Sequence, residues 1–79
     1  MKTIDLEKFL TRFAELFDET DAGEFKADTP FHTLDEWSSL LGLAVIAMID
    51  AEYGVRVSGE DIKNSKTIED LFNIVKERV

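Results

Sequence analysis

Apolar residues recur every three or four positions near the start of the chain. This spacing places them on one face of a helix and predicts an amphipathic first helix that ends near Asp18. We expect Thr3 to be its N-cap, with Asp5 and Glu7 in the first turn, where the helix dipole favours acidic side chains. The residues that form the apolar face are Leu6, Phe9, Leu10, Phe13, Leu16 and Phe17.

A long irregular connection is predicted from about Asp18 to Trp37. It contains the turn formers Gly23 and Pro30, and the residue before a proline is disfavoured in the helical region. Loops of this length within a compact domain are often functional. Four apolar residues would pack the connection against the rest of the domain: Phe25, Phe31, Leu34 and Trp37.

The most apolar part of the chain follows this connection. Residues 40–49 are interrupted only by Gly42, which predicts a second helix that is buried on more than one side. We expect it to begin at Ser38 or Ser39, to reach about Tyr53 and to end at Gly54.

Two further helices are predicted by their capping residues. Ser58 with Asp61 three residues later would begin a short third helix, and Thr67 with Asp70 would begin a fourth. The alternating segment at residues 55–57 is too short to indicate a sheet. The chain is therefore predicted to be a single all-α domain spanning residues 1–79.

The junction before the second helix resembles the acyl carrier protein family, in which an Asp-Ser-Leu motif carries 4′-phosphopantetheine on its serine. Counting back from the segment Glu52-Tyr53-Gly54-Val55, Ser39 corresponds to that serine and Leu40 to the leucine. Residues 59–62 and 67–71 resemble the family's third and last helices, so the resemblance covers most of the chain. It implies a four-helix bundle of the acyl-carrier type, with the arm attached to Ser39.

The resemblance also implies what the protein does. A phosphopantetheinyl transferase would install the arm from coenzyme A, and acyl groups would then be carried on the arm as thioesters. Ligases, ketosynthases or acyltransferases would be the further partners, in fatty-acid, polyketide or saccharide-modifying pathways. The carrier would not be an enzyme, because its contribution is to raise the effective concentration of a tethered intermediate.

The sequence departs from the family at two places. Ser38 stands where aspartate is usual, and it can still cap the helix but carries no charge. Leu41 and Ala44 occupy positions that are often acidic in fatty-acid carriers. With Met48 they form a helical stripe that is either a partner surface beside the arm or part of the inner core. Partner contacts are predicted at Ser38, Leu40, Leu41, Ala44 and Met48.

The sequence also bears on two other types of carrier or binding domain. A peptidyl carrier is disfavoured because its usual Gly-Gly element is replaced by residues 35–38, Asp-Glu-Trp-Ser. The second is a carrier-like interaction domain that is never modified, and this alternative stays open.

The composition limits which classes of partner and which kinds of site are expected. The 79 residues carry a formal net charge of −8, which disfavours nucleic acid and anionic membranes. The chain has no cysteine, so disulfides and thiolate zinc sites are excluded and any thioester sulfur must come from a prosthetic group. No segment reaches the roughly 18 apolar residues of a membrane span, and the N-terminus does not resemble a signal sequence. We expect a cytoplasmic monomer without a metal site.

The sequence gives little support for hydrolase, acid–base or calcium-binding chemistry. His32 is the only histidine and Gly-x-Ser-x-Gly is absent, so we expect His32 to be a satisfied or exposed loop residue, not the base of a hydrolase. The carboxylate pairs at 35–36 and 60–61 are typical of a solvated surface. The acidic turn at 18–23 resembles a calcium loop, but Ala22 and Thr29 replace two of the required ligands.

Overall fold

Four α-helices and two short 3₁₀ turns make up the computed structural model, which describes residues 4–79. The helices are α1 (Leu6–Ala14), α2 (Ser39–Tyr53), α3 (Gly59–Asn64) and α4 (Ile68–Arg78). The connection between α1 and α2 contains η1 (Ala22–Glu24) and η2 (Phe31–Thr33). No strand occurs in these residues, so the predicted all-α fold with a short third helix is confirmed.

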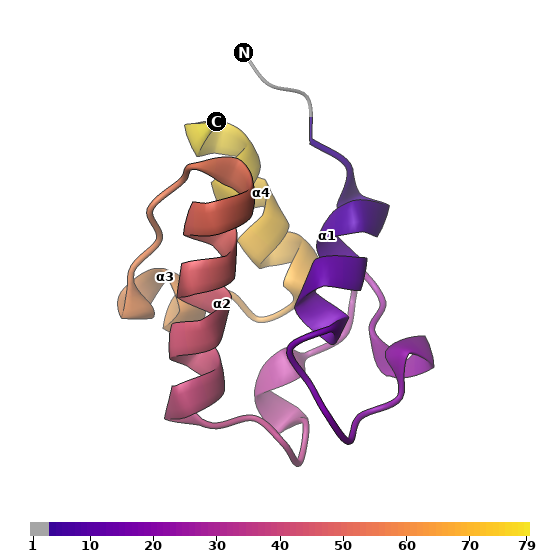
Figure 1. Ribbon diagram of the computed structural model, residues 1–79. Helices are drawn as coiled ribbons and strands as arrows, with labels where there is room; N and C mark the ends of the chain where they lie inside the picture. The colour runs from indigo at the N-terminus through magenta and orange to yellow at the C-terminus, as the bar shows by residue number, and fades with distance from the viewer. Residues whose placement is uncertain (1–3) are drawn as a thin grey trace.

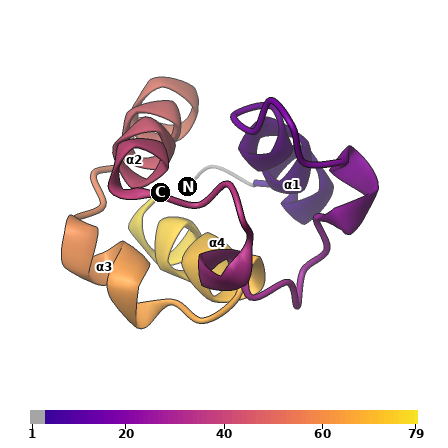
Figure 2. The ribbon, with the colours of Figure 1, turned by 90° about the horizontal axis from the view of Figure 1, so that it is seen from below.

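The helices form a closed ring of contacts in which α1 packs on α2, α2 on α3, α3 on α4 and α4 on α1. Figure 1 shows α2 running along the bundle with α3 beside it, and Figure 2 shows the four helices around a common centre. The radius of gyration is 11.4 Å. A compact chain of this length is expected to have a value of about 11.6 Å, so the short helices and the long connection still enclose one core.

Aromatic side chains fill much of that core, and all six phenylalanines are buried. Phe9 meets Phe72 edge-on at 5.5 Å between ring centroids, and Phe13 meets Phe31 in the same way at 5.5 Å. Such edge contacts are favoured by the quadrupoles of the rings. The α2 helix adds the buried residues Val45, Met48 and Ile49.

The first helix is shorter than its apolar pattern predicted. It ends at Ala14 because the N–H groups of Leu16 and Phe17 bond to carbonyls three residues back, which makes a tighter turn than an α-helix. Phe17 is nevertheless buried, so the apolar spacing marks the core but not the helix end. Asp5, predicted in the first turn, is the N-cap and accepts from the Glu7 N–H; Thr3 lies outside the described residues.

The long connection is packed down, as predicted. Phe25 and Phe31 are buried, and Leu34 and Trp37 pack against the same core. The connection also supplies partners for the start of α4: the N–H of Ile68 donates to the Thr29 carbonyl at 3.2 Å, and that of Glu69 donates to the Ala27 carbonyl at 2.9 Å. These two bonds satisfy N–H groups that a helix start leaves unpaired.

The predicted caps are confirmed at three helix ends. Ser58 with Asp61 and Thr67 with Asp70 form complete capping boxes, in which each side chain accepts from the backbone of the other residue. Gly54 ends α2 with a φ of 65°, a left-handed conformation that glycine adopts without steric cost.

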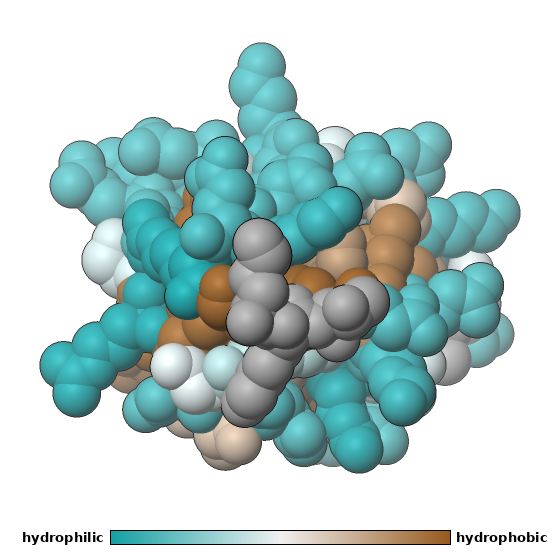
Figure 3. Space-filling model, turned by 90° about the horizontal axis from the view of Figure 1, so that it is seen from above, coloured by the Kyte–Doolittle hydropathy of each residue, from teal (hydrophilic) through white to brown (hydrophobic). Residues whose placement is uncertain are grey.

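The face of the molecule drawn in Figure 3 is predominantly hydrophilic. Seen from the end of the bundle at which α2 and α4 finish, hydrophilic residues surround a band of apolar ones (Figure 3). Among residues 4–79, no helix is long and apolar enough to cross a membrane.

Candidate functional site

Ser38 caps the start of α2. Its backbone is extended, with φ −156° and ψ 170°, and its side chain accepts a hydrogen bond from the Leu41 N–H at 3.3 Å. The first bond of the helical ladder runs from the Gly42 N–H to the Ser38 carbonyl at 3.0 Å. The predicted capping role of Ser38 is therefore confirmed, and the helix proper begins at Ser39.

Ser39 is the first residue of α2, and its side chain is exposed. The N–H groups of Ser39 and Leu40 precede the first bond of the ladder and have no carbonyl partner within the helix. No acidic residue lies in the first turn of α2. An anionic group on the Ser39 hydroxyl would therefore meet the positive end of the helix dipole without a nearby carboxylate on that turn to repel it.

Glu36 fixes the backbone that leads into this serine pair. Its carboxylate accepts from the N–H of Asp18 at 2.9 Å, the N–H of Glu19 at 3.0 Å and the hydroxyl of Thr20 at 2.8 Å. Desolvation raises the pKa of Glu36, but the hydrogen bonds from Thr20, Glu19 and Asp18 stabilise the carboxylate and lower the pKa overall. The turn after α1 is thus tied to the residues just before Trp37.

Trp37 is the apolar anchor next to the serines. Its ring meets Phe31 edge-on at 4.9 Å between centroids and is stacked with Phe17 at 6.4 Å. A methyl group at Gly42 would lie 3.7 Å from Cζ2 of the indole, so Trp37 contacts α2 one turn beyond Ser39. This packing orients the start of α2 relative to the connection.

His32 connects the same loop to α3. Its Nε2 lies 3.0 Å from the Ile62 carbonyl and 2.9 Å from the Ser65 carbonyl. Because both partners are acceptors, Nε2 carries the proton and donates to them. A nitrogen engaged in this way is not a base directed at Ser39, and the predicted role of His32 as a satisfied loop residue is confirmed.

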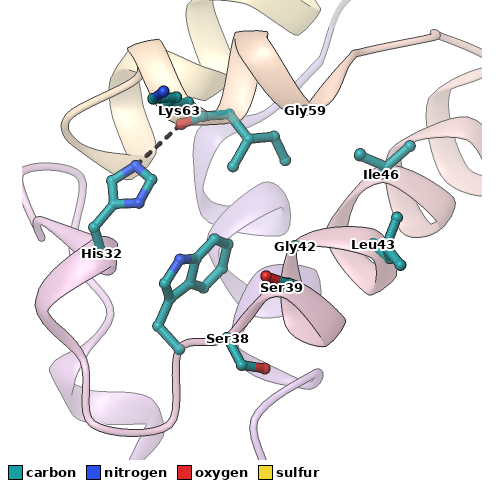
Figure 4. Close-up of a pocket in the computed structure, with 10 residues that line it drawn as sticks. His32, Ser38, Ser39, Gly42, Leu43, Ile46, Gly59 and Lys63 are labelled. Atoms are coloured by element: carbon teal, nitrogen blue, oxygen red, sulfur yellow. Dashed lines mark hydrogen bonds between the residues drawn. The ribbon is translucent and has the colours of Figure 1, made fainter.

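A groove of about 510 Å³ opens beside Ser39, between the first half of α2 and α3. This volume lies within the range typical of small-molecule sites, roughly 300–1,000 Å³. Figure 4 shows Ser39, Leu43 and Ile46 along α2, with Gly59 and Lys63 across the groove on α3. Its ten lining residues include the cation Lys63 and none that is acidic. The groove therefore offers apolar walls, an exposed hydroxyl on α2 and a cation on the opposite side.

The residues predicted to contact partners are not equally accessible. Leu40 is exposed, whereas Leu41 and Ala44 are half-buried and Leu41 packs against the core. Met48 is only 8% exposed and belongs to the core. For the stripe formed by Leu41, Ala44 and Met48, these positions favour the inner-core interpretation that the sequence had left open.

Leu43 and Glu36 were not identified from the sequence as contributors to this site. Leu43 is 64% exposed and lines the groove. The sequence did contain a sign that some apolar side chain of α2 is exposed, because residues 40–49 hold more apolar side chains than one face of a helix can bury. The role of Glu36 had no such signal, since its three donors lie 16 to 18 residues earlier in the chain.

The remaining carboxylates have structural roles or lie in turns. Asp61 accepts from Ser58 in its capping box and pairs with Arg78 at 2.8 Å. In the acidic turn, Asp21 accepts from the Gly23 N–H at 3.0 Å. Within residues 4–79, no cluster of histidine, cysteine or acidic residues is arranged to hold a metal ion.

Comparison with known proteins gives one match. A family model described as "Phosphopantetheine attachment site" matches residues 7–75, which is most of the chain. No curated protein and no solved structure matches it. The matched span contains the start of α2, the exposed Ser39 and the groove beside it.

Proposed function

Because the chain belongs to the phosphopantetheine attachment-site family, whose members carry 4′-phosphopantetheine covalently on a serine, we propose that it is an acyl carrier protein with the arm on Ser39. The observation that supports Ser39 most directly is its place as the exposed first residue of α2, directly after its N-cap. The adjacent Ser38 is a poorer acceptor for the arm, since its hydroxyl oxygen is used in the cap.

The residues around Ser39 fit a tethered phosphodiester. The unpaired N–H groups at the start of α2 favour an anion, and the groove beside it has apolar walls with Lys63 as a cation. The arm supplies a terminal thiol that holds acyl groups as thioesters, and the chain itself, without cysteine, has no thiol. The protein's own contribution is to present the tether at the start of a helix whose preceding connection is tied to the rest of the domain by Glu36, Trp37 and His32.

Carrier domains interact with phosphopantetheinyl transferases and with biosynthetic enzymes, and they are not catalytic themselves. We propose that this carrier serves a specialised lipid, polyketide or related pathway outside housekeeping fatty-acid synthesis. This proposal is supported by the sequence of α2, in which residues 39–49 bear no charge. Carriers of primary fatty-acid synthesis resemble one another in an acidic helix at this place.

The cargo chemistry can be tested on protein isolated from cells. We expect intact-mass spectra of the wild type to show species that shift on treatment with hydroxylamine, which cleaves thioesters, and that are absent from Ser39→Ala. A wild-type protein that never carries an arm or a hydroxylamine-sensitive group would instead favour the alternative, an unmodified interaction domain.

A further inference from the structure

Two adjoining hollows lie between α1 and the connection that follows it, and we call them together the connection surface. The first, of about 290 Å³, is an apolar groove whose walls include the buried Phe17 and Phe25. The second, of about 370 Å³, is an acidic hollow. Thr20 lines both hollows, and its hydroxyl donates to Glu36 at 2.8 Å. The acidic hollow is lined by four carboxylates, those of Glu19, Glu24, Asp35 and Glu36.

Most of the protein's net charge is concentrated in this part of the chain. Residues 15–36 hold eight acidic residues and one lysine, a net charge of −7, whereas the whole chain carries −8. The side chains of Glu19, Glu24 and Asp35 form no ion pair with the described residues 4–79. Like charges gathered in one region repel one another, and solubility requires only that charge be spread over the surface. Folding and solubility therefore do not account for the concentration.

The two hollows together specify a partner with an apolar side chain next to cations. The volume of the apolar groove is just below the roughly 300–1,000 Å³ of small-molecule sites, so the groove suits one aliphatic or aromatic side chain. The acidic hollow beside it suits arginine or lysine, since these cations form charge-assisted hydrogen bonds with carboxylates. Nucleic acid, an anionic membrane and a second copy of the chain would each be repelled by the negative charge.

The connection surface lies away from the groove beside Ser39. Figures 1 and 2 show α1 and the purple turn that contains η1 on the opposite side of the molecule from α3, which forms one wall of that groove. The α2 helix bears no charge over residues 39–49, so it does not attract a cationic surface through its own side chains. A partner bound at the connection surface therefore leaves the groove beside Ser39 open.

We propose that the connection surface is a docking site for a protein partner that projects one apolar side chain flanked by arginine or lysine. The apolar side chain enters the apolar groove, and the cations pair with Glu19 and Glu24 in the acidic hollow. Buried anchors mainly set the dissociation rate and exposed charges mainly set the association rate. The proposal does not require an arm on Ser39, so it can fail while the proposed function holds, and the reverse.

The chemistry of this partner can be tested by titrating the full chain with the synthetic peptide acetyl-Arg-Leu-Arg-amide and following the backbone amides by NMR. We expect shifts around the connection surface, including Thr11, Ala14 and Thr20, with the amides of Leu40 and Leu43 unchanged. Replacing the leucine of the peptide by serine should raise Kd about tenfold, because the apolar contact in the groove is lost. Replacing both arginines of the peptide by glutamate should abolish binding.

A matched pair of variants tests the acidic hollow. Glu19→Gln combined with Glu24→Gln removes two charges from the hollow, whereas Glu69→Gln combined with Glu77→Gln removes two exposed charges from α4. At low salt we expect the first double variant to raise Kd for the arginine peptide about fivefold and the second to change it less than twofold. The difference between the two variants should shrink at high salt, which screens exposed charges.

Several results would overturn this docking site. They are the absence of shifts at the connection surface, shifts centred on Leu40 and Leu43, equal Kd for the serine and leucine peptides, and equal losses in the two double variants. Displacement of the peptide by Mg²⁺, with shifts of the same amides, would assign the acidic hollow to a divalent cation and would also overturn the proposal.

Discussion

Replacement of Asp61 by asparagine tests how α3, one wall of the groove, is held. The Asp61 carboxylate accepts from the Ser58 N–H at 2.9 Å and from Arg78 Nη1 at 2.8 Å. The side-chain bond from Arg78, reinforced by the Ser58 N–H, lowers the pKa of Asp61 from 3.8 to about 2. Asparagine keeps an oxygen for Ser58 but removes the charge that pairs with Arg78.

The expected loss of folding free energy in Asp61→Asn follows from this shift in pKa. A difference of nearly two units corresponds to at most about 2.5 kcal/mol of folding free energy. The Arg78 side chain is 43% exposed, and solvent screening of such a pair reduces the contribution to about 1 kcal/mol. Because the pKa is lowered on folding, this stability is present above the unfolded pKa near 4 and is lost as the pH falls toward 2.

Urea unfolding followed by circular dichroism measures this effect. At pH 7 we expect Asp61→Asn to be about 1 kcal/mol less stable than the wild type, and the difference should shrink between pH 5 and pH 3. Asp70→Asn is the matched control, since Asp70 accepts from Thr67 in the same kind of capping box and forms no ion pair with the described residues 4–79. A difference that is the same at pH 7 and pH 3 would refute the role of charge.

Three further changes probe the start of α2. Ser38→Ala should cost about 1 kcal/mol of unfolding free energy through loss of the cap and leave the arm on Ser39; a loss of loading in a folded variant would contradict this. Glu36→Gln should lower the melting temperature at pH 7 by more than at pH 3, because the lowered pKa of Glu36 makes its stabilising effect decline as the pH falls below the usual range of a glutamate and the carboxylate is protonated; equal losses at both pH values would refute it. His32→Ala should cost about 1–2 kcal/mol, since it removes the donor to two carbonyls, without abolishing loading; a folded variant that cannot be loaded would make His32 part of the modification chemistry.

Much of the fold follows from local sequence signals. Capping boxes at Ser58 and Thr67, the glycine that ends α2 and the apolar spacing of α1 act within a few residues, so their consequences could be predicted. The residue at which α1 ends could not be predicted, because the apolar spacing continues through the tighter turn at Leu16 and Phe17.

The candidate site likewise combines local features, which the sequence predicts, with contacts between distant segments, which it does not. Ser39 and its cap are local features of one helix end, and the cap was predicted correctly. Which α2 residues face solvent depends on where α1, α3 and the connection pack, so the exposure of Leu43 and the burial of Met48 needed the structure. The bonds of Glu36 and His32 likewise join segments about 16 to 33 residues apart.

The central claim is that Ser39 carries the arm. It is tested most directly by loading the purified protein with a phosphopantetheinyl transferase and coenzyme A, and by locating the arm with tandem mass spectrometry of the peptide that contains Ser38 and Ser39. The account predicts the arm on Ser39 in the wild type and in Ser38→Ala, and none on a folded Ser39→Ala. An arm on Ser38, or no arm when the same transferase loads another carrier, would contradict it.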